Sequence, residues 1–406
     1  ANRVLIGTCL PYAFTRKINE LAVKTKIHPA LIDVIDIQSH QDQAVEIKAD
    51  QDTERMIIEK LKTGFSRLKR IDPPDQHLMP SIQKALVVGG GIAGMTTALA
   101  IADHGFEVDL IEQDKDLGGN LLWLKQTIDG HDIQAFLDET MEKIEKHPLL
   151  NVHTQTAVTS SFGQAGHFLT TIENKEDHVL ETIEHGAAVL ATGGTAAPTT
   201  AYGYGKSPVI VTHKELEEDL KNKSIDPSSL KVVVMIQCVD SREKDQKNYC
   251  SRICCSSTLK HALHLKSSNP DITIYVFYRD MMAYGFIETY YTKARKKGIH
   301  FIQYNLENKP DVSPGESSVI VTGIEPIIKA PIKINADLLV LATGISPTLP
   351  KDLADHLGIQ TDEFGFFEEA ESKWRPVDAL KEGIFACGLC HSPRNITETV
   401  ASAEAS

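Results

Sequence analysis

The sequence has no apolar run that approaches the ~20 residues needed for a helix to span a membrane. Its N-terminal segment also lacks the charged region and long apolar core of a secretory signal peptide. Positive charge is in deficit, since 42 Lys and Arg face 55 Asp and Glu, and the net charge of −13 argues against a non-specific nucleic-acid binder. These absences predict a cytoplasmic protein with no membrane span and no nucleic-acid partner.

The cysteines do not suit a disulfide framework, because their number, seven, is odd. Four of them, Cys238, Cys250, Cys254 and Cys255, fall within 18 residues of each other. The last two are adjacent, and adjacent cysteines do not easily form a relaxed disulfide with each other. In a cytosolic protein such a group indicates a metal site more than a disulfide.

A chain of 406 residues is too long for one ordinary hydrophobic core, so we expect two or three domains. Residues 1–80 read as a small unit with one strand and two amphipathic helices, and its end at 71–81 is a proline-rich linker. From Lys84 the pattern changes to strand, glycine turn, helix and strand, which begins a βαβ fold. The predicted domains are a small N-terminal domain (1–80), the first half of a dinucleotide-binding domain (81–204), an inserted second Rossmann-like domain (205–325) and the second half of the first (326–406).

The βαβ pattern carries a dinucleotide fingerprint. Residues 89–94, Gly-Gly-Gly-Ile-Ala-Gly, fit G-x-G-x-x-G between a buried strand and a helix, and Glu112 ends the next strand. Gly89 permits the tight turn, Gly91 lets the backbone approach a pyrophosphate, and Gly94 allows close helix–strand packing. The helix N-terminus favours the phosphate charge. Glu112 accepts hydrogen bonds from ribose hydroxyls and would repel a 2′-phosphate, so NADP is disfavoured at this site.

Further glycine segments follow at Leu117-Gly118-Gly119-Asn120, at two Ala-Thr-Gly sequences (191–193 and 342–344) and at 383–388. Together they resemble the signature of flavoproteins with two dinucleotide-binding domains, and the resemblance implies FAD rather than NAD at the fingerprint. Those flavoproteins usually place an aspartate after the last segment, where this chain has Leu389. The predicted FAD contacts are Gly89, Gly91, Ile92, Ala93, Gly94, Glu112, Gly118, Gly119, Asn120, Ala191, Thr192, Gly193, Thr343, Gly344, Gly388 and Leu389.

The second Rossmann-like unit lacks a glycine loop of its own. After its first strand, at 232–236, the turn at 237–242 contains no glycine, so we predict no nicotinamide site there. The strand end instead begins the pattern C-x11-C-x3-C-C, whose last two cysteines open a helix. Four thiolates in this arrangement suit an iron–sulfur cluster. Zinc is the chemical rival, although zinc ribbons prefer two C-x2-C pairs, and four buried structural cysteines are the remaining reading.

Three other cysteines leave alternatives open. Cys387 and Cys390 form C-x-x-C inside the late flavin segment, where packing or tuning of the flavin is favoured over a redox disulfide. Cys9 reads as a core residue, or as a cluster ligand if the N-terminal domain folds over that site. The segment Tyr278-Arg279-Asp280 closes a strand and is followed by Tyr284-Gly285-Phe286. It reads either as a strand end with a solvated charge pair or as a loop near the flavin or cluster. No pair of side chains suggests acid–base catalysis, so we assign no catalytic residue.

Several segments together resemble the A-type subunits (HdrA) of heterodisulfide reductase over roughly residues 81–406. The most specific are YCSRICC at 249–255 and YRD-x3-YGF at 278–286. The resemblance implies an α/β, thioredoxin-reductase-like pair of Rossmann-type domains, FAD, and a [4Fe–4S] cluster held by Cys238, Cys250, Cys254 and Cys255. Because no further cysteine-rich or ferredoxin-like segments are present, the chain looks like the short HdrA-like form of sulfur-oxidising bacteria.

The resemblance further implies iron–sulfur partner subunits of a heterodisulfide-reductase-like complex, and a homodimer. The expected function is therefore electron transfer in cytoplasmic sulfur oxidation. Two alternatives stay open. One is a stand-alone NAD(P)H-dependent disulfide oxidoreductase that uses Cys387 and Cys390. The other is a non-catalytic scaffold for the complex with vestigial cofactor sites.

Overall fold

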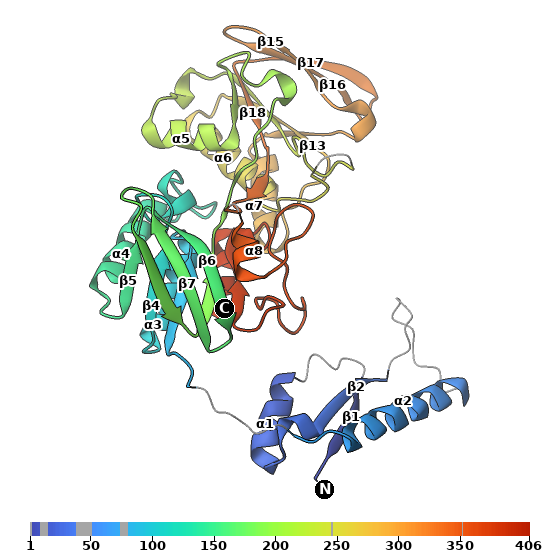
Figure 1. The fold of residues 1–406 in the computed structure, drawn as a ribbon. Coiled ribbons are helices and arrows are strands. Elements are labelled where there is room, and N and C mark those ends of the chain that lie inside the picture. Colours follow the sequence, from blue (N-terminus) through green and yellow to red (C-terminus); the bar gives the residue numbers. More distant parts are fainter. Residues whose placement is uncertain (1, 9–14, 38–50, 74–79, 245–246, 351) are drawn as a thin grey trace. The chain divides into compact units, whose positions relative to one another are not determined.

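The computed structural model describes residues 2–8, 15–37, 51–73, 80–244, 247–350 and 352–406 (Figure 1). The chain forms two compact units. The first comprises Ala1–Pro80 with Lys373–Arg375, and the second comprises Ser81–Ser372 with Pro376–Ser406. Among the described residues, no helix has the length and apolarity that a membrane span requires.

The first unit is a small βαβα arrangement. Strands β1 (Val4–Thr8) and β2 (Ile32–Asp36) pair in parallel, helix α1 (Thr15–Thr25) connects them, and α2 (Gln51–Lys69) follows. Gly64 lets α2 approach both strands, because a Cβ atom there would lie 3.1–3.2 Å from side chains of Ile35 and Leu5. Both helices were expected from the sequence and β2 was not. Cys9 lies outside the described residues.

The second unit contains two parallel five-stranded sheets. The first sheet has the order β20-β9-β3-β4-β5. Its strands are β3 (Lys84–Val88), β4 (Glu107–Ile111), β5 (Leu150–His153), β9 (Ala187–Leu190) and β20 (Ile384–Ala386). Helices α3 (Ile92–Asp103), α4 (Ile133–Lys146) and α9 (Ile396–Ala405) pack on one face through a core that includes Met95, Leu137 and Ala403.

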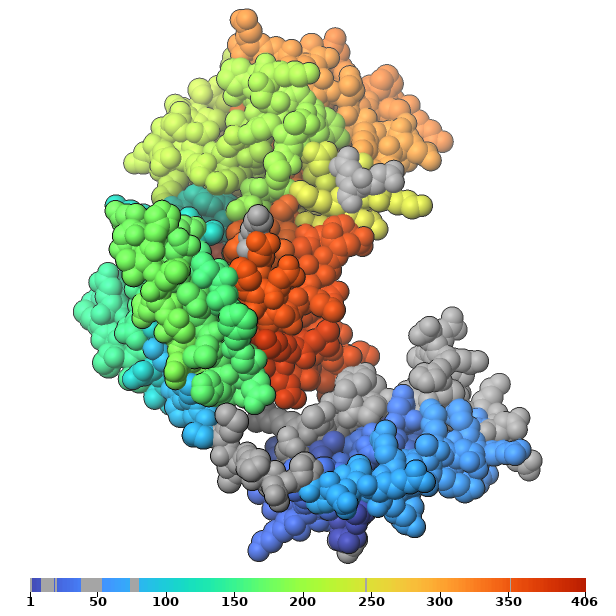
Figure 2. Space-filling model, viewed as in Figure 1, coloured from blue at the N-terminus to red at the C-terminus, as the bar shows by residue number. Residues whose placement is uncertain are grey.

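An antiparallel sheet covers the other face of the first sheet. It consists of β6 (Thr156–Gln164), β7 (His167–Asn174) and β8 (Leu180–His185), and its core residues Phe168, Ile172 and Ile183 cluster with those of β3 and β9. Helix α8 (Leu353–Leu357) joins the same core. Segments that are distant in sequence, near residues 160 and 355, therefore lie side by side, as the adjoining green and red atoms in Figure 2 show.

The second sheet repeats this plan. Its order is β11-β18-β12-β13-β14, with all strands parallel. The strands are β11 (Ile210–Thr212), β12 (Val232–Ile236), β13 (Thr273–Tyr278), β14 (His300–Gln303) and β18 (Leu338–Leu341). Helices α5 (His213–Asn222), α6 (Cys254–Ser268) and α7 (Glu288–Lys296) cover one face, and an antiparallel sheet of β15 (Asp311–Pro314), β16 (Val319–Glu325) and β17 (Ala330–Ala336) covers the other. The predicted pair of Rossmann-type folds is confirmed.

Two short strands mark where the chain passes between these sheets. Strand β10 (Gly194–Ala196) leaves the first sheet, β19 (Ile345–Pro347) returns from the second, and the two pair antiparallel. Residue 325, the predicted limit of the inserted domain, is the last residue of β16. Strand β17 still belongs to the antiparallel sheet that covers the second sheet, and β18 is a strand of the second sheet itself. The return therefore lies about twenty residues later than that limit.

His185, at the end of β8, makes stability depend on pH. The ring is fully buried, its Nδ1 donates to the Ala187 carbonyl at 2.9 Å, and its Nε2 accepts from the Thr170 hydroxyl at 2.7 Å. Burial lowers the pKa of His185 to about 4, although the bond to Ala187 opposes the shift. The unfolded chain, with a histidine pKa near 6.5, binds more protons below that pH, so stability falls as the pH drops from 6.5 towards 4.

We expect the free energy of unfolding of the wild type to fall by about 2 kcal/mol more than that of His185→Gln between pH 7 and pH 5. Urea unfolding at the two pH values measures the difference. His104→Gln, at an exposed position, is the control and should follow the wild type. Equal pH dependence of wild type and His185→Gln would contradict the assignment.

Candidate functional site

The first glycine loop joins β3 to α3 and is built by close backbone contacts. Gly89 has φ +113°, and a Cβ atom on it would lie 2.2 Å from the Ala191 carbonyl oxygen. A Cβ atom on Gly94 would lie 1.7 Å from the Gly89 carbonyl oxygen, so only glycine lets the helix pack there. Gly91 differs, because a Cβ atom on it would meet nothing within 4 Å. The loop therefore presents open backbone at the N-terminus of α3, where a phosphate binds favourably.

The second glycine loop lies directly against the first. The Gly118 amide donates to the Gly90 carbonyl at 2.8 Å, and Gly91 and Gly118 form a parallel β-bridge. A Cβ atom on Gly119 would lie 3.3 Å from the Gly91 Cα atom. Asn120 extends this contact by donating from Nδ2 to the Gly194 carbonyl at 2.7 Å. The structure thus brings Gly91, Gly118, Gly119 and Asn120 together, as their predicted common role requires.

Glu112 holds the first glycine loop in place through hydrogen bonds to backbone amides. Its Oε2 accepts from the Gly90 amide at 2.6 Å, its Oε1 accepts from the Asp114 amide at 2.8 Å, and the side chain is buried. A carboxylate has about four acceptor sites, so two remain for ribose hydroxyls. The bond to Gly90 was not predicted from the sequence, and it gives Glu112 a structural role besides the ligand contact expected of it.

The C-terminal flavin segment returns to the same place. A Cβ atom on Gly388, which has φ +72°, would lie 2.7 Å from the Ala93 Cβ atom in the first turn of α3. The Leu389 Cβ atom lies 3.3 Å from the position that a Cβ atom on Gly194 would take. Gly193 is open, with nothing within 4 Å of such an atom. The open backbone and the acceptor sites of Glu112 fit a dinucleotide.

The second Ala-Thr-Gly segment follows a strand of the second sheet, and its Gly344 carbonyl accepts from the Ala197 amide, close after the first segment, at 3.0 Å. Thr343 and Gly344 follow β18 in the second sheet, and a Cβ atom on Gly344 would lie 2.4 Å from the Ser251 Oγ atom. The Ser251 hydroxyl also accepts from the Ile345 amide at 2.8 Å. Thr343 and Gly344 are therefore placed beside the cysteine-bearing loop, and their predicted contact with FAD stays a prediction.

The four clustered cysteines lie on the segment between the carboxyl end of β12 and the start of α6. Cys238 follows the strand, and Cys254 and Cys255 are the first residues of α6. Burial raises the pKa of the Cys254 thiol, and Cys255, Cys238 and Cys250 raise it further in that order. Burial likewise raises the pKa of Cys255 to about 12, with Cys238 and Cys250 adding to the effect. The four thiols therefore share one electrostatic environment.

Three of the sulfur atoms already accept N–H groups. The Arg252 amide lies 3.3 Å from the Cys250 Sγ atom, the Met282 amide lies 3.4 Å from the Cys255 Sγ atom, and an Arg242 guanidinium nitrogen lies 3.9 Å from the Cys238 Sγ atom. Such donors stabilise anionic sulfur and tune iron–sulfur clusters. In the described ranges, no three His, Cys, Asp or Glu side chains are already arranged to hold a metal ion. The chemistry of the donors fits a cluster, and the side chains would have to converge to bind one.

The backbone of the cysteine loop is strained. Cys238, Asp240, Arg242 and Arg252 all have φ between +50° and +60°, a region that residues other than glycine rarely adopt. Conformations of this kind cost of order 1–3 kcal/mol each and concentrate at functional sites. These four residues all lie in the segment from Cys238 to Cys255, which contains the predicted cluster ligands. Their concentration there indicates that the loop is shaped for binding.

Arg252 connects this loop to the C-terminal helix. Its guanidinium donates to the Glu398 carboxylate at 2.6 Å and to the Tyr284 hydroxyl at 2.8 Å, and it reaches the Pro393 carbonyl at 3.3 Å. The structure makes Arg252 a bridge between the cysteine loop and α9, which packs beside the late flavin segment through Gly388 and Ser402.

Cys387 and Cys390 do not form a disulfide and point into different cores. Cys387 is buried with α3 and α9, its Sγ atom 3.7 Å from the Thr97 hydroxyl, while Cys390 belongs to the core shared with β6–β8. Burial raises the pKa of the Cys390 thiol to about 12. Their burial and separate surroundings suit packing, which the sequence favoured over a redox pair.

Comparison with known proteins defines the class first. A family described as pyridine nucleotide-disulphide oxidoreductase matches residues 83–235. Solved structures share the fold. Thioredoxin reductase of T. acidophilum aligns with a TM-score of 0.53 and 15% identity over 79% of this chain and 95% of that chain. The thioredoxin reductase of Lactococcus lactis aligns with a TM-score of 0.54 and 18% identity, over 79% of this chain and 95% of that chain. These likenesses show that the chain has the thioredoxin-reductase-like fold.

Comparison with relatives of known name gives a more specific resemblance. The chain is 25% identical to the A-type subunit of ferredoxin:CoB-CoM heterodisulfide reductase from Methanosarcina acetivorans, over 99% of this chain and 65% of the relative. It is 27% identical to one of the A-type iron-sulfur subunits of CoB–CoM heterodisulfide reductase from Methanopyrus kandleri, over 99% of this chain and 74% of the relative. The chain thus spans about two thirds of the first relative's length. The predicted resemblance to the A-type subunits of heterodisulfide reductase is confirmed.

Proposed function

We propose that this protein is an FAD- and [4Fe–4S]-containing electron-transfer subunit of a heterodisulfide-reductase-like complex. One observation carries the proposal: after the carboxyl end of β12, where a nucleotide-binding glycine loop would lie, Cys238 follows instead, Cys254 and Cys255 begin α6, and burial together with Cys255, Cys238 and Cys250 raises the pKa of the Cys254 thiol. When bound, FAD supplies two-electron chemistry and the cluster carries single electrons. The name of the Methanopyrus kandleri relative, which describes an iron–sulfur subunit, supports the same proposal.

The residues of the glycine loops would hold FAD. The amides at the N-terminus of α3, beginning at Gly91, would bind the pyrophosphate, and Glu112 would accept the ribose hydroxyls with the acceptor sites that it keeps free. Gly388 and Leu389 would face the flavin end, because they pack against Ala93 and Gly194. These side chains bind and orient, and none is placed to move a proton.

Cys238, Cys250, Cys254 and Cys255 would hold the cluster. The amide of Arg252 and the guanidinium of Arg242 would offset the charge of its sulfur ligands. Arg252 also reaches Glu398 on α9, so the ligand loop is fixed to the helix that packs on the flavin segment. This connection supports direct electron transfer between FAD and the cluster.

The proposal includes a place in cytoplasmic sulfur oxidation, iron–sulfur partner subunits and a homodimer. The alignment with the Methanosarcina acetivorans relative supports the short form. It runs over 532 positions while this chain has 406 residues, so the aligned part of the relative contains segments that this chain lacks. The free cysteines among the described residues suit a reducing compartment. The burial of Cys387 and Cys390 in separate cores makes the stand-alone disulfide oxidoreductase the weaker alternative.

Anaerobic purification followed by flavin and iron analysis tests the proposal. We expect about four irons and about one FAD per chain, with the absorption and EPR signals of a [4Fe–4S] cluster after reduction. Colourless, iron-free protein would support a non-catalytic scaffold instead. Zinc in place of iron, at about one atom per chain, would also refute the electron-transfer role.

A further inference from the structure

Residues 280–286 connect the cysteine site to an exposed surface. The Met282 amide donates to the Cys255 Sγ atom at 3.4 Å, and Phe286 follows four residues later. A fully extended chain covers at most about 14 Å over that length, so Phe286 lies close to the ligand sulfur. Tyr284, between them, is held by Arg252 and Glu398.

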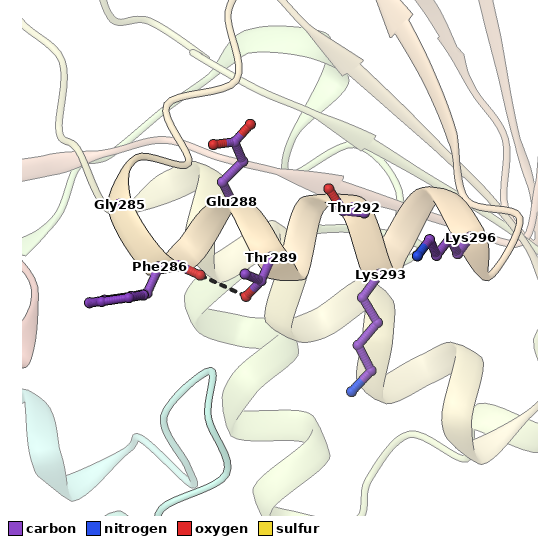
Figure 3. Close-up of a pocket in the computed structure, with 7 residues that line it drawn as sticks. All are labelled: Gly285, Phe286, Glu288, Thr289, Thr292, Lys293 and Lys296. Carbon is purple, nitrogen blue, oxygen red and sulfur yellow. Dashed lines mark hydrogen bonds between the residues drawn. The ribbon is translucent and has the colours of Figure 1, made fainter.

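This short segment exposes an unusual amount of apolar side chain. Phe286 is 92% exposed, Tyr284 is 40% exposed and Met282 is 39% exposed. Aromatic residues and methionine are enriched in the cores of protein interfaces, and single exposed aromatic anchors often dominate the binding energy. Figure 3 shows Phe286 projecting away from the start of α7, while its carbonyl accepts a hydrogen bond from Thr289 at 2.7 Å.

A hollow of about 530 Å³ runs along α7 from this anchor. Its lining comprises Gly285, Phe286, Glu288, Thr289, Thr292, Lys293 and Lys296. Lys293 extends clear of the helix in Figure 3. Arg295 and Lys297 add positive charge at the same helix end. The surface is therefore basic and partly apolar, on a chain whose net charge is −13.

We propose that this surface, formed by Met282, Tyr284, Phe286, Lys293 and Lys296, is the docking site for a small acidic electron-carrier protein. The inference deepens the proposed function, because it names the partner of the same cysteine site. Local positive charge selects an acidic partner and raises its rate of encounter, while the aromatic anchor fills an apolar contact. Exchange there moves one electron from the reduced centre to the oxidised one, with no atom or proton transferred.

A second copy of this chain suits the surface less well. A two-fold dimer through this patch would place one basic surface against the same basic surface of the other copy, since a two-fold interface uses one patch twice. The resulting repulsion opposes association. The simpler alternative is that the lysines only complement the dipole of α7, as cations in a last helical turn do. A matched control separates this reading from docking.

The control uses α4, whose last turn carries Lys143 and Lys146 at the same spacing of three residues. Lys293→Glu/Lys296→Glu and Lys143→Glu/Lys146→Glu change the net charge equally and oppose the helix dipole equally. The control also breaks exposed ion pairs with Glu139 and Glu142, and exposed pairs of this kind contribute little to stability. To test the apolar contact, Phe286→Ala is compared with Phe162→Ala, since Phe162 is also exposed, to 70%, on β6.

The probe is a plant-type ferredoxin, a small acidic carrier, and cytochrome c is its basic counterpart. Calorimetry on the full chain is expected to show ferredoxin binding that weakens as salt rises from about 20 mM to about 200 mM. Both the lysine variant and Phe286→Ala should raise the Kd for ferredoxin at least tenfold, or about 1.4 kcal/mol. Both control variants should stay within about twofold of the wild type.

The proposal is overturned if ferredoxin binds no tighter than cytochrome c, or if the controls lose as much affinity as the test variants. It is also overturned if sedimentation shows a wild-type dimer that the lysine variant dissociates, because the surface would then join two copies. Binding does not require the cluster. Iron-free protein that still binds ferredoxin refutes the proposed function alone, and iron-loaded protein without this binding refutes the docking site alone.

Discussion

Replacing Gly91 with alanine is expected to leave the fold intact and to weaken FAD binding at least tenfold, or by about 1.4 kcal/mol. Gly91 has φ −75°, which alanine adopts without strain, and the added methyl group meets no protein atom within 4 Å. The methyl group would instead occupy the space in which the pyrophosphate approaches the α3 amides. Fluorescence titration of the apoprotein with FAD measures the loss, and thermal unfolding of the apoprotein should show no loss of stability.

Gly94→Ala provides the contrast. Its methyl group would lie 1.7 Å from the Gly89 carbonyl oxygen, so the helix must shift and the apoprotein should lose about 3 kcal/mol of stability. FAD binding without change in Gly91→Ala would show that the dinucleotide does not lie on this loop. Equal destabilisation of both apoproteins would show that the open space at Gly91 is absent.

Replacing Cys254 with serine is expected to lower the iron content from about four atoms per chain to below about one, and to remove the [4Fe–4S] EPR signal. Cys254 opens α6, and the other three cysteines all contribute to the raised pKa of its thiol, so it is the predicted ligand that we test. A serine hydroxyl is a poor iron–sulfur ligand and cannot replace it. FAD content should be unchanged, because the glycine loops lie on the first sheet.

Cys387→Ser is the matched control. Its hydroxyl would find the Thr97 and Ser406 hydroxyls, which already surround the Cys387 sulfur, so the substitution is tolerated in the core. Iron should stay at about four atoms per chain in this variant. Iron retained in Cys254→Ser would contradict the assigned ligand set, and iron lost equally from both variants would point to general destabilisation.

The sequence predicted the flavin-type loop well because its determinants are local. Glycine spacing and a buried run specify β3, α3 and β4, and Glu112 follows from the length of the strand. Strands β15–β17 were not predicted. Pro314 and Pro331 lie within them, and proline normally indicates a loop or an edge strand. The core that these strands cover depends on contacts that no local pattern reveals.

Long-range contacts explain what was missed at the candidate sites. Arg252 pairs with Glu398, which is 146 residues away, and nothing near either residue in the sequence announces the pair. Thr343 and Gly344 matched a flavoprotein segment by sequence, and the fold places Gly344 between Ser251 and the Ala197 amide, neither of which is near it in the sequence. The bond from the Gly90 amide to Glu112 likewise depends on how two strand ends meet.

The pairing of β10 with β19 has a consequence for synthesis on the ribosome. The first sheet gains β20 and α9 only after the whole second sheet has been made, because those elements occupy Ile384–Ala386 and Ile396–Ala405. Domains generally fold as units while the chain is still emerging, so the second sheet can fold while the first is incomplete. Gly388 therefore reaches α3 late, and the glycine loop at the start of α3 is complete only after translation has passed α9.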